Sequence, residues 1–172
     1  MTMRHAEREI RDKEIIKAIL DMCEVINIGF FDDKYPYVLP VNFGYEYGDD
    51  LVFYTHHAPD GYKNTLVARN PNVCVATNVF KGHIYNDYDH SSHDYRSVMA
   101  FGEMAFIDPG AVEYERAWRA LGRAYGHDVS NHLLTPESKN SALMGKITCR
   151  PENVVGKAQR PIKGLDDVPF KI

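Results

Sequence analysis

The sequence lacks most of the features that mark specialised protein classes. Its 172 residues include only three cysteines, Cys23, Cys74 and Cys149, and no CxxC pair. This argues against a disulfide framework and a thiolate zinc site, and it is typical of a reducing compartment. No stretch approaches the ~20 apolar residues of a membrane span, and the charged N-terminus has no apolar signal core. We therefore expect a cytoplasmic protein without a membrane segment.

Concentrated positive charge and common catalytic motifs are also missing. The chain has 20 Lys plus Arg against 24 Asp plus Glu, a formal net charge of −4, and no basic block. Nucleic acid is therefore not an expected partner. No GxSxG, HExxH, GxxxxGK[ST] or GxGxxG motif occurs. These absences disfavour hydrolase, zinc-protease and dinucleotide-fold interpretations.

What is present is typical of one ordinary domain. The chain is 44% hydrophobic and 26% charged, with no internal repeat and no Pro/Gly-rich linker. A chain of this size buries enough surface for a core of its own, so we expect a single domain over 1–172. Its 11 tyrosines exceed what a core needs, because a buried phenol must find a hydrogen-bond partner. Some of them therefore indicate a pocket or a subunit interface.

Hydrophobic periodicity and turn residues predict a mainly β fold with helices. Apolar residues at helical spacing after Asp12 predict a helix over about 13–23 with Asp12 as its cap. A short helix is predicted over 61–69, and a further helix, containing Trp118 and Leu121, after Pro109. Strands are predicted over 25–31, 37–47, 51–56, 73–79, 95–107, 142–150 and 153–155. About six antiparallel strands with two or three helices predict a small barrel; the segment 125–140 is left unassigned.

The run KGHIYNDYDHSSHD, residues 81–94, loses all periodicity and predicts a long loop. We expect it to edge the opening through which a substrate enters. Its residue types also bind divalent metals. However, the histidines fit no known ligand spacing, so we predict no native metal. The residues in question are His83, Asp87, Asp89, His90, His93 and Asp94.

A second window, Thr55 to Asn64, combines a strand end, a glycine-containing loop and Lys63 in the first turn of a helix. Free N–H groups at a helix start, a hydroxyl and an ammonium suit a phosphate group. A plain strand–turn–helix connection with a solvated lysine is the alternative. The pattern alone favours that alternative, because such loose motifs often match by chance.

Four motifs in register carry a family resemblance over nearly the whole chain. They are YPYVLPVNFGY (35–45), THHA with Gly61 and Lys63 (55–63), NPNVC (70–74), and YRSV with Gly102 (95–102). The opening MRHAEREI (3–10) and Gly156-Lys157 agree with the same pattern. The sequence resembles the flavin-binding split-barrel proteins, and within them most resembles the 5-nitroimidazole-resistance family, which is related to pyridoxamine 5′-phosphate oxidase.

This resemblance implies a six-stranded antiparallel split barrel and a homodimer with an FMN in each of two clefts between the subunits. FMN needs cations and N–H donors at its phosphate and apolar surface at its ring. The implied cofactor-binding residues are Pro40, Val41 and Asn42 at the isoalloxazine edge, Thr55, His56, His57 and Lys63 at the ribityl phosphate, and Tyr95, Arg96 and Ser97 near the phosphate and ribityl chain.

Structural explanations compete with several of these roles. Arg96 can form a surface salt bridge with Asp94 or Glu103, and Asn42 can be a turn residue or a satisfied core amide. For His56, the catalytic interpretation is donation to the cofactor or movement of a proton, and the alternative is a bond to a backbone carbonyl.

Two residues also depart from the family pattern. The family usually has Ser or Gly at the position of His57, and often Arg at that of Tyr62. A site with fewer positive charges is expected to retain FMN less tightly.

The sequence therefore predicts an FMN-dependent oxidoreductase that reduces small acceptors such as nitroaromatics. A non-catalytic flavin-binding or sensor protein is an alternative of a different class, because a fold does not fix a function. A pyridoxamine 5′-phosphate oxidase is a third possibility. It is disfavoured because the final stretch QRPIKGLDDVPFKI lacks an arginine-rich segment for a second phosphate.

Overall fold

The computed structural model describes residues 3–86, 90–126, 142–159 and 162–167. Within these ranges the chain forms mainly antiparallel β-sheet with three α-helices. The strands are β1 (Glu9–Ile10), β2 (Val25–Phe30), β3 (Tyr37–Asn42), β4 (Gly44–Tyr47), β5 (Leu51–His57), β6 (Asn72–Asn86), β7 (His90–Ile107), β8 (Leu143–Cys149) and β9 (Val154–Ala158). The helices are α1 (Lys13–Asp21), α2 (Tyr62–Arg69) and α3 (Val112–Ala124), with short 3-10 turns at Ala6–Arg8, Pro151–Asn153 and Leu165–Asp167.

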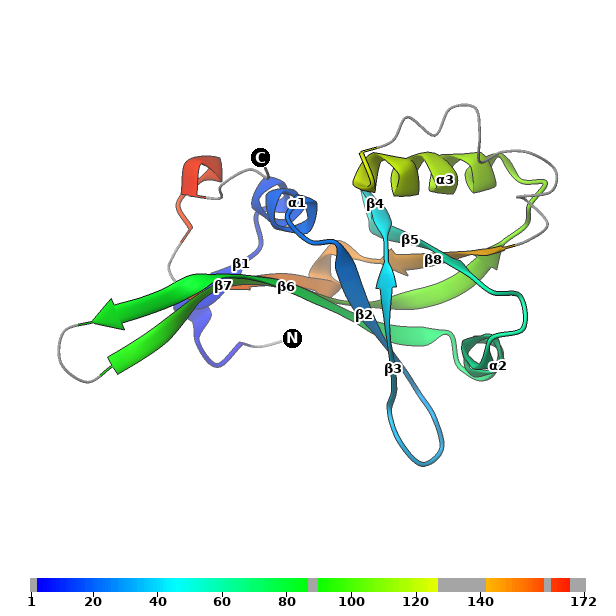
Figure 1. The fold of residues 1–172 in the computed structure, drawn as a ribbon, viewed down its shortest axis with the longest axis horizontal. Helices are drawn as coiled ribbons and strands as arrows, with labels where there is room; N and C mark the ends of the chain where they lie inside the picture. The colour runs from blue at the N-terminus through cyan, green and yellow to red at the C-terminus, as the bar shows by residue number, and fades with distance from the viewer. Residues whose placement is uncertain (1–2, 87–89, 127–141, 160–161, 168–172) are drawn as a thin grey trace.

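The strands join in the order β3-β2-β6-β7-β8-β5-β4, and β9 pairs with both β1 and β7. Two hairpins, β2–β3 and β6–β7, extend away from the body of the molecule (Figure 1). The expectation of six strands is wrong in number, because the described residues form nine. Among the described residues, hydrogen bonds also do not join the two end strands of this order, β3 and β4, so the sheet is not a closed barrel. The run 37–47 divides at Phe43 into β3 and β4, which pair with β2 and β5 respectively.

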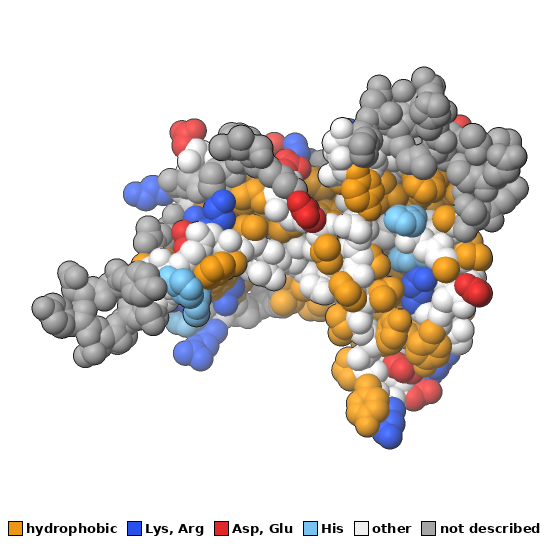
Figure 2. All heavy atoms as spheres, viewed as in Figure 1, with side chains coloured by type: hydrophobic (Ala, Val, Ile, Leu, Met, Phe, Trp, Pro, Cys, Tyr) orange, Lys and Arg blue, Asp and Glu red, His pale blue; other side chains and the backbone are white. Residues whose placement is uncertain are grey.

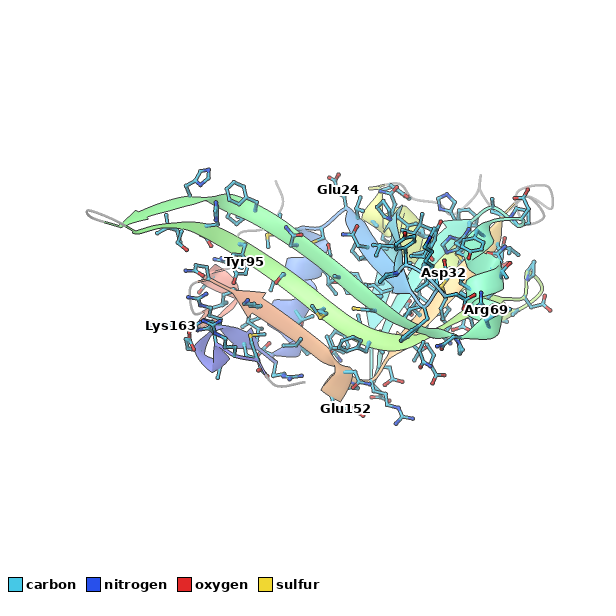
Figure 3. The ribbon with its side chains drawn as sticks, turned by 90° about the horizontal axis from the view of Figure 1, so that it is seen from below. Glu24, Asp32, Arg69, Tyr95, Glu152 and Lys163 are labelled. Carbon is cyan, nitrogen blue, oxygen red and sulfur yellow. The ribbon has the colours of Figure 1, made fainter. Side chains whose placement is uncertain are left out.

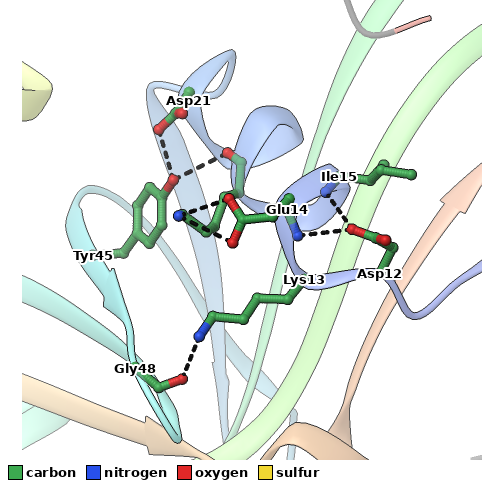
Figure 4. Close-up of polar contacts among 8 residues, drawn as sticks. Asp12, Lys13, Glu14, Ile15, Asp21, Tyr45 and Gly48 are labelled. Carbon is green, nitrogen blue, oxygen red and sulfur yellow. Dashed lines mark hydrogen bonds and ion pairs between the residues drawn. The ribbon is translucent and has the colours of Figure 1, made fainter. Parts of the chain in front are cut away.

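The core is covered by α1 and α3. Helix α1 begins as expected, because the Asp12 carboxylate accepts hydrogen bonds from the backbone N–H groups of Glu14 (2.9 Å) and Ile15 (3.0 Å), as Figure 4 shows. Its apolar face buries Ile15, Ile16, Ile19 and Leu20 against the sheet. Helix α3 lies directly on β4, where a Cβ on Gly44 would come within 2.3 Å of the helix backbone at Ala120. None of the described helices has the length and hydropathy of a membrane span.

The predicted loop over 81–94 is wrong, because β6 continues to Asn86 and β7 begins at His90. The register shifts between Phe80 and Gly82, and Gly82 has a φ of +138°. Such a bulge interrupts the alternation by which strands are recognised in a sequence. Asp87 and Asp89 lie outside the described residues, as does most of the unassigned segment 125–140.

Candidate functional site

Three of the expected phosphate residues lie together and are buried. Thr55 and His57 end β5, and Lys63 lies in the first turn of α2; their exposed fractions are 0%, 5% and 7%. The Thr55 hydroxyl oxygen and His57 Nε2 are 2.6 Å apart, which is hydrogen-bonding distance. We call Thr55, His57 and Lys63 the Lys63 cluster.

Two glycines make room for this cluster. Gly145 on β8 is paired with Thr55, and a Cβ there would lie 2.8 Å from His57 Nε2 and 3.0 Å from Thr55 Oγ1. A Cβ on Gly61, the residue that precedes α2, would lie 2.6 Å from Lys63 Nζ. The polar atoms of the cluster therefore occupy space that ordinary side chains would fill. Gly145 was missed in the sequence because nothing local marks a glycine that becomes adjacent only through strand pairing.

The electrostatics of the Lys63 cluster favour an anion. Burial lowers the pKa of Lys63, and the nearby Asp60 carboxylate acts in the opposite direction. Burial, followed by the charges of Lys63 and His56, lowers the pKa of His57 to about 3, so this imidazole is neutral at pH 7. Among the described residues, Lys63 forms no hydrogen bond or ion pair. A buried ammonium normally has a partner, so this one fits a negatively charged ligand.

His56 lies beside this cluster but points to solvent. Its ring stacks on Trp118 of α3, with centroids 6.0 Å apart and an interplanar angle of 22°. His57 instead packs edge-on against Phe106, at 6.2 Å. Figure 2 shows histidine and cationic side chains near one another on the right of the molecule, below α3. The alternative interpretation of His56, a bond to a backbone carbonyl, is not realised among the described residues, and the residue is exposed.

The expected ring-edge residues lie on a different strand, β3. Pro40 and Asn42 are exposed and Val41 is half-buried. The Asn42 amide nitrogen donates to the backbone oxygen of Glu24 (3.1 Å), so the side chain braces the start of β2 and is neither a turn residue nor a core amide. Asn42 also lines a cleft of about 970 Å³ between α1 and α3.

Tyr95, Arg96 and Ser97 lie on a distant part of β7. In the strand register, Phe106 is level with Gly145 and hence with Thr55. Arg96 is ten residues farther along β7, which is roughly 33 Å of extended strand. Figure 3 shows Tyr95 far from Asp32 and Arg69, which lie at the end of the molecule that contains α2. Within one chain, therefore, the structure does not bring Arg96 to the Lys63 cluster.

Arg96 is buried, with 6% of its surface exposed, and it is paired with Asp94. Its Nη1 donates to the Asp94 carboxylate and to the backbone oxygen of Tyr95 (3.1 Å). The salt-bridge interpretation with Asp94 is confirmed, although the pair is partly buried and not at the surface. Its Nε is buried without a hydrogen-bond partner among the described residues.

A second large cleft, of about 950 Å³, is lined by the end of β2, the β2–β3 connection and parts of β6, β7 and β8. It is lined by aromatic side chains that include Phe31, Tyr35 and Phe101. Neither large cleft includes a member of the Lys63 cluster. The cluster is therefore identified by its burial and its chemistry and not by cavity size.

One family profile matches most of the chain. The sequence profile described as pyridoxamine 5′-phosphate oxidase matches residues 12–156. A provisionally assigned 5-nitroimidazole antibiotic resistance protein from Bacteroides thetaiotaomicron is 28% identical, with a TM-score of 0.70 over 92% of this chain and 96% of that one.

Two structures share the fold at lower identity. A FAD and haem binding protein from Mycobacterium smegmatis is 20% identical (TM-score 0.70; 94% of this chain and 78% of that one). A flavocytochrome from Azotobacter vinelandii is 19% identical (TM-score 0.71; 96% and 77%). No curated protein matches the chain. Because the family profile covers most of the sequence, the chain belongs to the pyridoxamine 5′-phosphate oxidase family.

Proposed function

We propose that this protein is an FMN-dependent oxidoreductase that reduces small acceptors such as nitroaromatics. The observation that carries the proposal is the buried Lys63 ammonium, which forms no hydrogen bond or ion pair among the described residues and lies beside the buried Thr55–His57 pair. The names of relatives support it further. The mycobacterial and Azotobacter structures are named for flavin cofactors, and the Bacteroides protein for nitroimidazole resistance.

In this proposal the Lys63 cluster holds the cofactor phosphate. Lys63 supplies the positive charge. Thr55 and the neutral His57 share one hydrogen bond, so together they supply one further donor: His57 Nδ1–H when the Thr55 hydroxyl donates to Nε2, or the Thr55 hydroxyl when Nε2–H donates to Oγ1. Because His57 is uncharged at pH 7, Lys63 is the cluster's one positive charge, which favours modest retention of FMN. The burial of all three side chains keeps water from competing for these contacts.

The predicted site residues on β7 fit the proposal only with a second copy of the chain. Arg96 cannot reach Lys63 within one chain, so we assign Tyr95, Arg96 and Ser97 to the site of the partner in a homodimer. Pro40, Val41 and Asn42 remain assigned to the isoalloxazine edge. A homodimer would have a mass of about 39 kDa, twice the 19.6 kDa of the chain, which light scattering measures directly.

A bound FMN supplies two-electron transfer from an external donor, such as a reduced nicotinamide, to an acceptor; a nitroaromatic that gains two electrons and two protons becomes a nitroso compound and water. His56 is the side chain assigned to hold or donate a proton near the ring, because it is exposed at the end of β5 and braced by Trp118.

Cofactor binding is tested first, with FMN and FAD titrated separately against the apoprotein. We expect a two-band flavin spectrum at one FMN per chain, and Lys63→Met should weaken FMN binding about 10- to 100-fold, as expected for loss of one charge-assisted contact. Lys34→Met removes an exposed lysine from the β2–β3 connection and is the matched control, which should bind like the wild type. Equal FMN affinity in the wild type and Lys63→Met would show that the phosphate lies elsewhere. Tighter binding of FAD than of FMN would identify FAD as the cofactor.

Activity is tested with the FMN-loaded protein, a reduced nicotinamide and a 5-nitroimidazole. We expect donor-dependent loss of the nitro absorbance, slowed at least tenfold in His56→Gln with flavin binding unchanged. A flavin-loaded dimer without turnover on any acceptor would overturn the enzymatic half and leave a flavin-binding protein. Oxidation of pyridoxamine 5′-phosphate under air, without nitro reduction, would instead identify an oxidase.

A further inference from the structure

The outer part of the β6–β7 hairpin brings two histidines face to face. His83 on β6 is paired with His93 on β7, and their ring centroids are 5.1 Å apart with an interplanar angle of 55°. Directly opposed residues of an antiparallel pair project from the same face of the sheet. Both histidines are exposed, so this face of the hairpin presents two imidazoles to solvent.

A bulge adds an aromatic wall to this pair. The register shift between Phe80 and Gly82 leaves Lys81 without an opposing residue. Phe80 would otherwise project from the opposite face to His83, because residues three apart in a regular strand alternate sides. Instead its ring lies 5.2 Å from that of His83 and 5.8 Å from that of His93. The positive φ of Gly82 (+138°) permits the bulge. Figure 2 shows histidine beside a hydrophobic side chain on this hairpin.

We propose that His83 and His93 form a binding site for a divalent first-row transition metal. Two nitrogens that bind one metal at about 2.0–2.1 Å are about 3 Å apart. Imidazoles with centroids 5.1 Å apart reach that separation when their ring nitrogens turn toward each other. Spacing in the sequence gives no sign of this site, since residues ten apart match no ligand motif; the hairpin makes them neighbours.

The ligand set determines which metals the site takes. Asp94, the nearest carboxylate in the sequence, is already paired with Arg96, so the described ligands are imidazoles alone. Imidazole favours Cu²⁺, Ni²⁺ and Zn²⁺ over Mg²⁺ and Ca²⁺, and Cu²⁺ binds most tightly in this series. Two protein ligands leave coordination positions for water or for a further small molecule.

The test is calorimetric titration of the full-length, tag-free protein with Cu²⁺ and, separately, with Zn²⁺. We expect about one ion of tighter affinity per chain, with Cu²⁺ bound more tightly than Zn²⁺. His83→Gln and His93→Gln should each weaken Cu²⁺ binding at least tenfold, and the double variant should lose this ion. His5→Gln, which removes a partly exposed histidine elsewhere, is the control and should bind like the wild type. Electron paramagnetic resonance of the Cu²⁺ complex should show coupling to two nitrogens, which the single variants reduce to one.

Retention of the ion by the double variant, or an equal loss in His5→Gln, would overturn the proposal. Circular dichroism of each variant checks that the hairpin substitutions leave the fold intact. If a single variant misfolds, His83→Asn or His93→Asn gives the same measurement with a smaller side chain. FMN binding is not part of this test, so its outcome and that of the proposed oxidoreductase activity are independent.

Discussion

In the part of the chain that the structure describes, two cations are buried, at opposite ends of the sheet, and their surroundings differ. Arg96 on β7 is 6% exposed and is paired with Asp94. Lys63 on α2 is 7% exposed and has no ion pair among the described residues. The Arg96 pair is neutral as a unit, whereas the Lys63 cluster retains a net positive charge beside the neutral His57.

This difference separates a charge that is compensated within the chain, at Arg96, from one that has no ion pair there, at Lys63. A buried cation with its own carboxylate is compensated within the fold, and removing either partner leaves the other exposed to a poorly solvating environment. A buried cation without one lowers the stability of the ligand-free protein, and the lowered pKa of Lys63 expresses that cost. An anion that binds beside Lys63 in the folded protein would offset the cost of burying this ammonium.

The largest expected effect comes from substituting each cation in the ligand-free protein. Arg96→Met should lower the free energy of unfolding by about 2–3 kcal/mol, because it leaves the partly buried Asp94 carboxylate unpaired. Lys63→Met should leave stability unchanged or raise it, because methionine fills the space without a charge to desolvate. Urea unfolding of the apoproteins measures both.

The double substitution Arg96→Met with Asp94→Asn is the control, and it should recover most of the lost stability because both charges are gone. Equal destabilisation by Lys63→Met and Arg96→Met would show that the Lys63 charge is stabilised within the fold, as that of Arg96 is. The contrast between the two ends of the sheet would then disappear.

The next effect concerns His57 and pH. Its pKa is about 3 in the folded protein and about 6.5 in an unfolded chain. Between these values the unfolded chain binds a proton that the folded protein does not, so stability falls as the pH decreases. From pH 7 to pH 5, this histidine should account for a loss of about 2 kcal/mol.

His57→Gln is the comparison, because glutamine retains a donor and an acceptor toward Thr55 but does not titrate. Thermal melts at pH 7 and pH 5 should show a drop in Tm that is smaller in the variant by roughly 4–8 °C. Parallel drops in the two proteins would mean that His57 is accessible to protons, contrary to its 5% exposure.

The sequence predicts much of the fold, because the signals for its elements are local. The cap at Asp12 and the apolar spacing of the next residues predict α1, and alternation with turn residues predicts β2 and β5 nearly to their ends. The hairpin over 81–94 is missed because the bulge at Gly82 disrupts the alternation. The division of 37–47 at Phe43 is missed because it depends on which strand pairs with each half.

The candidate site is predictable only in part, and the reason is again the range of the signal. Lys63 and Thr55 are eight residues apart, so a local strand–turn–helix pattern can place them together. The room that Gly145 leaves for them depends on strand pairing across ninety residues, which no local pattern contains. The pairing of Arg96 with Asp94 can be anticipated from their spacing, but its distance from Lys63 follows from the register of β7.

Substitution of a third cation, Lys146, should change the free energy of unfolding least. It is paired with Glu113 at 2.6 Å, but both side chains remain about one third exposed, at 30% and 36%. Lys146→Met should therefore cost less than about 1 kcal/mol in urea unfolding, and 1 M salt should reduce the difference. Lys146 lies on β8 next to Gly145, so its charge is near the Lys63 cluster but already neutralised. FMN affinity should not change in Lys146→Met. If this variant lost as much FMN affinity as Lys63→Met, the position of a lysine near the site, and not the lack of an ion pair, would determine which lysine holds the phosphate.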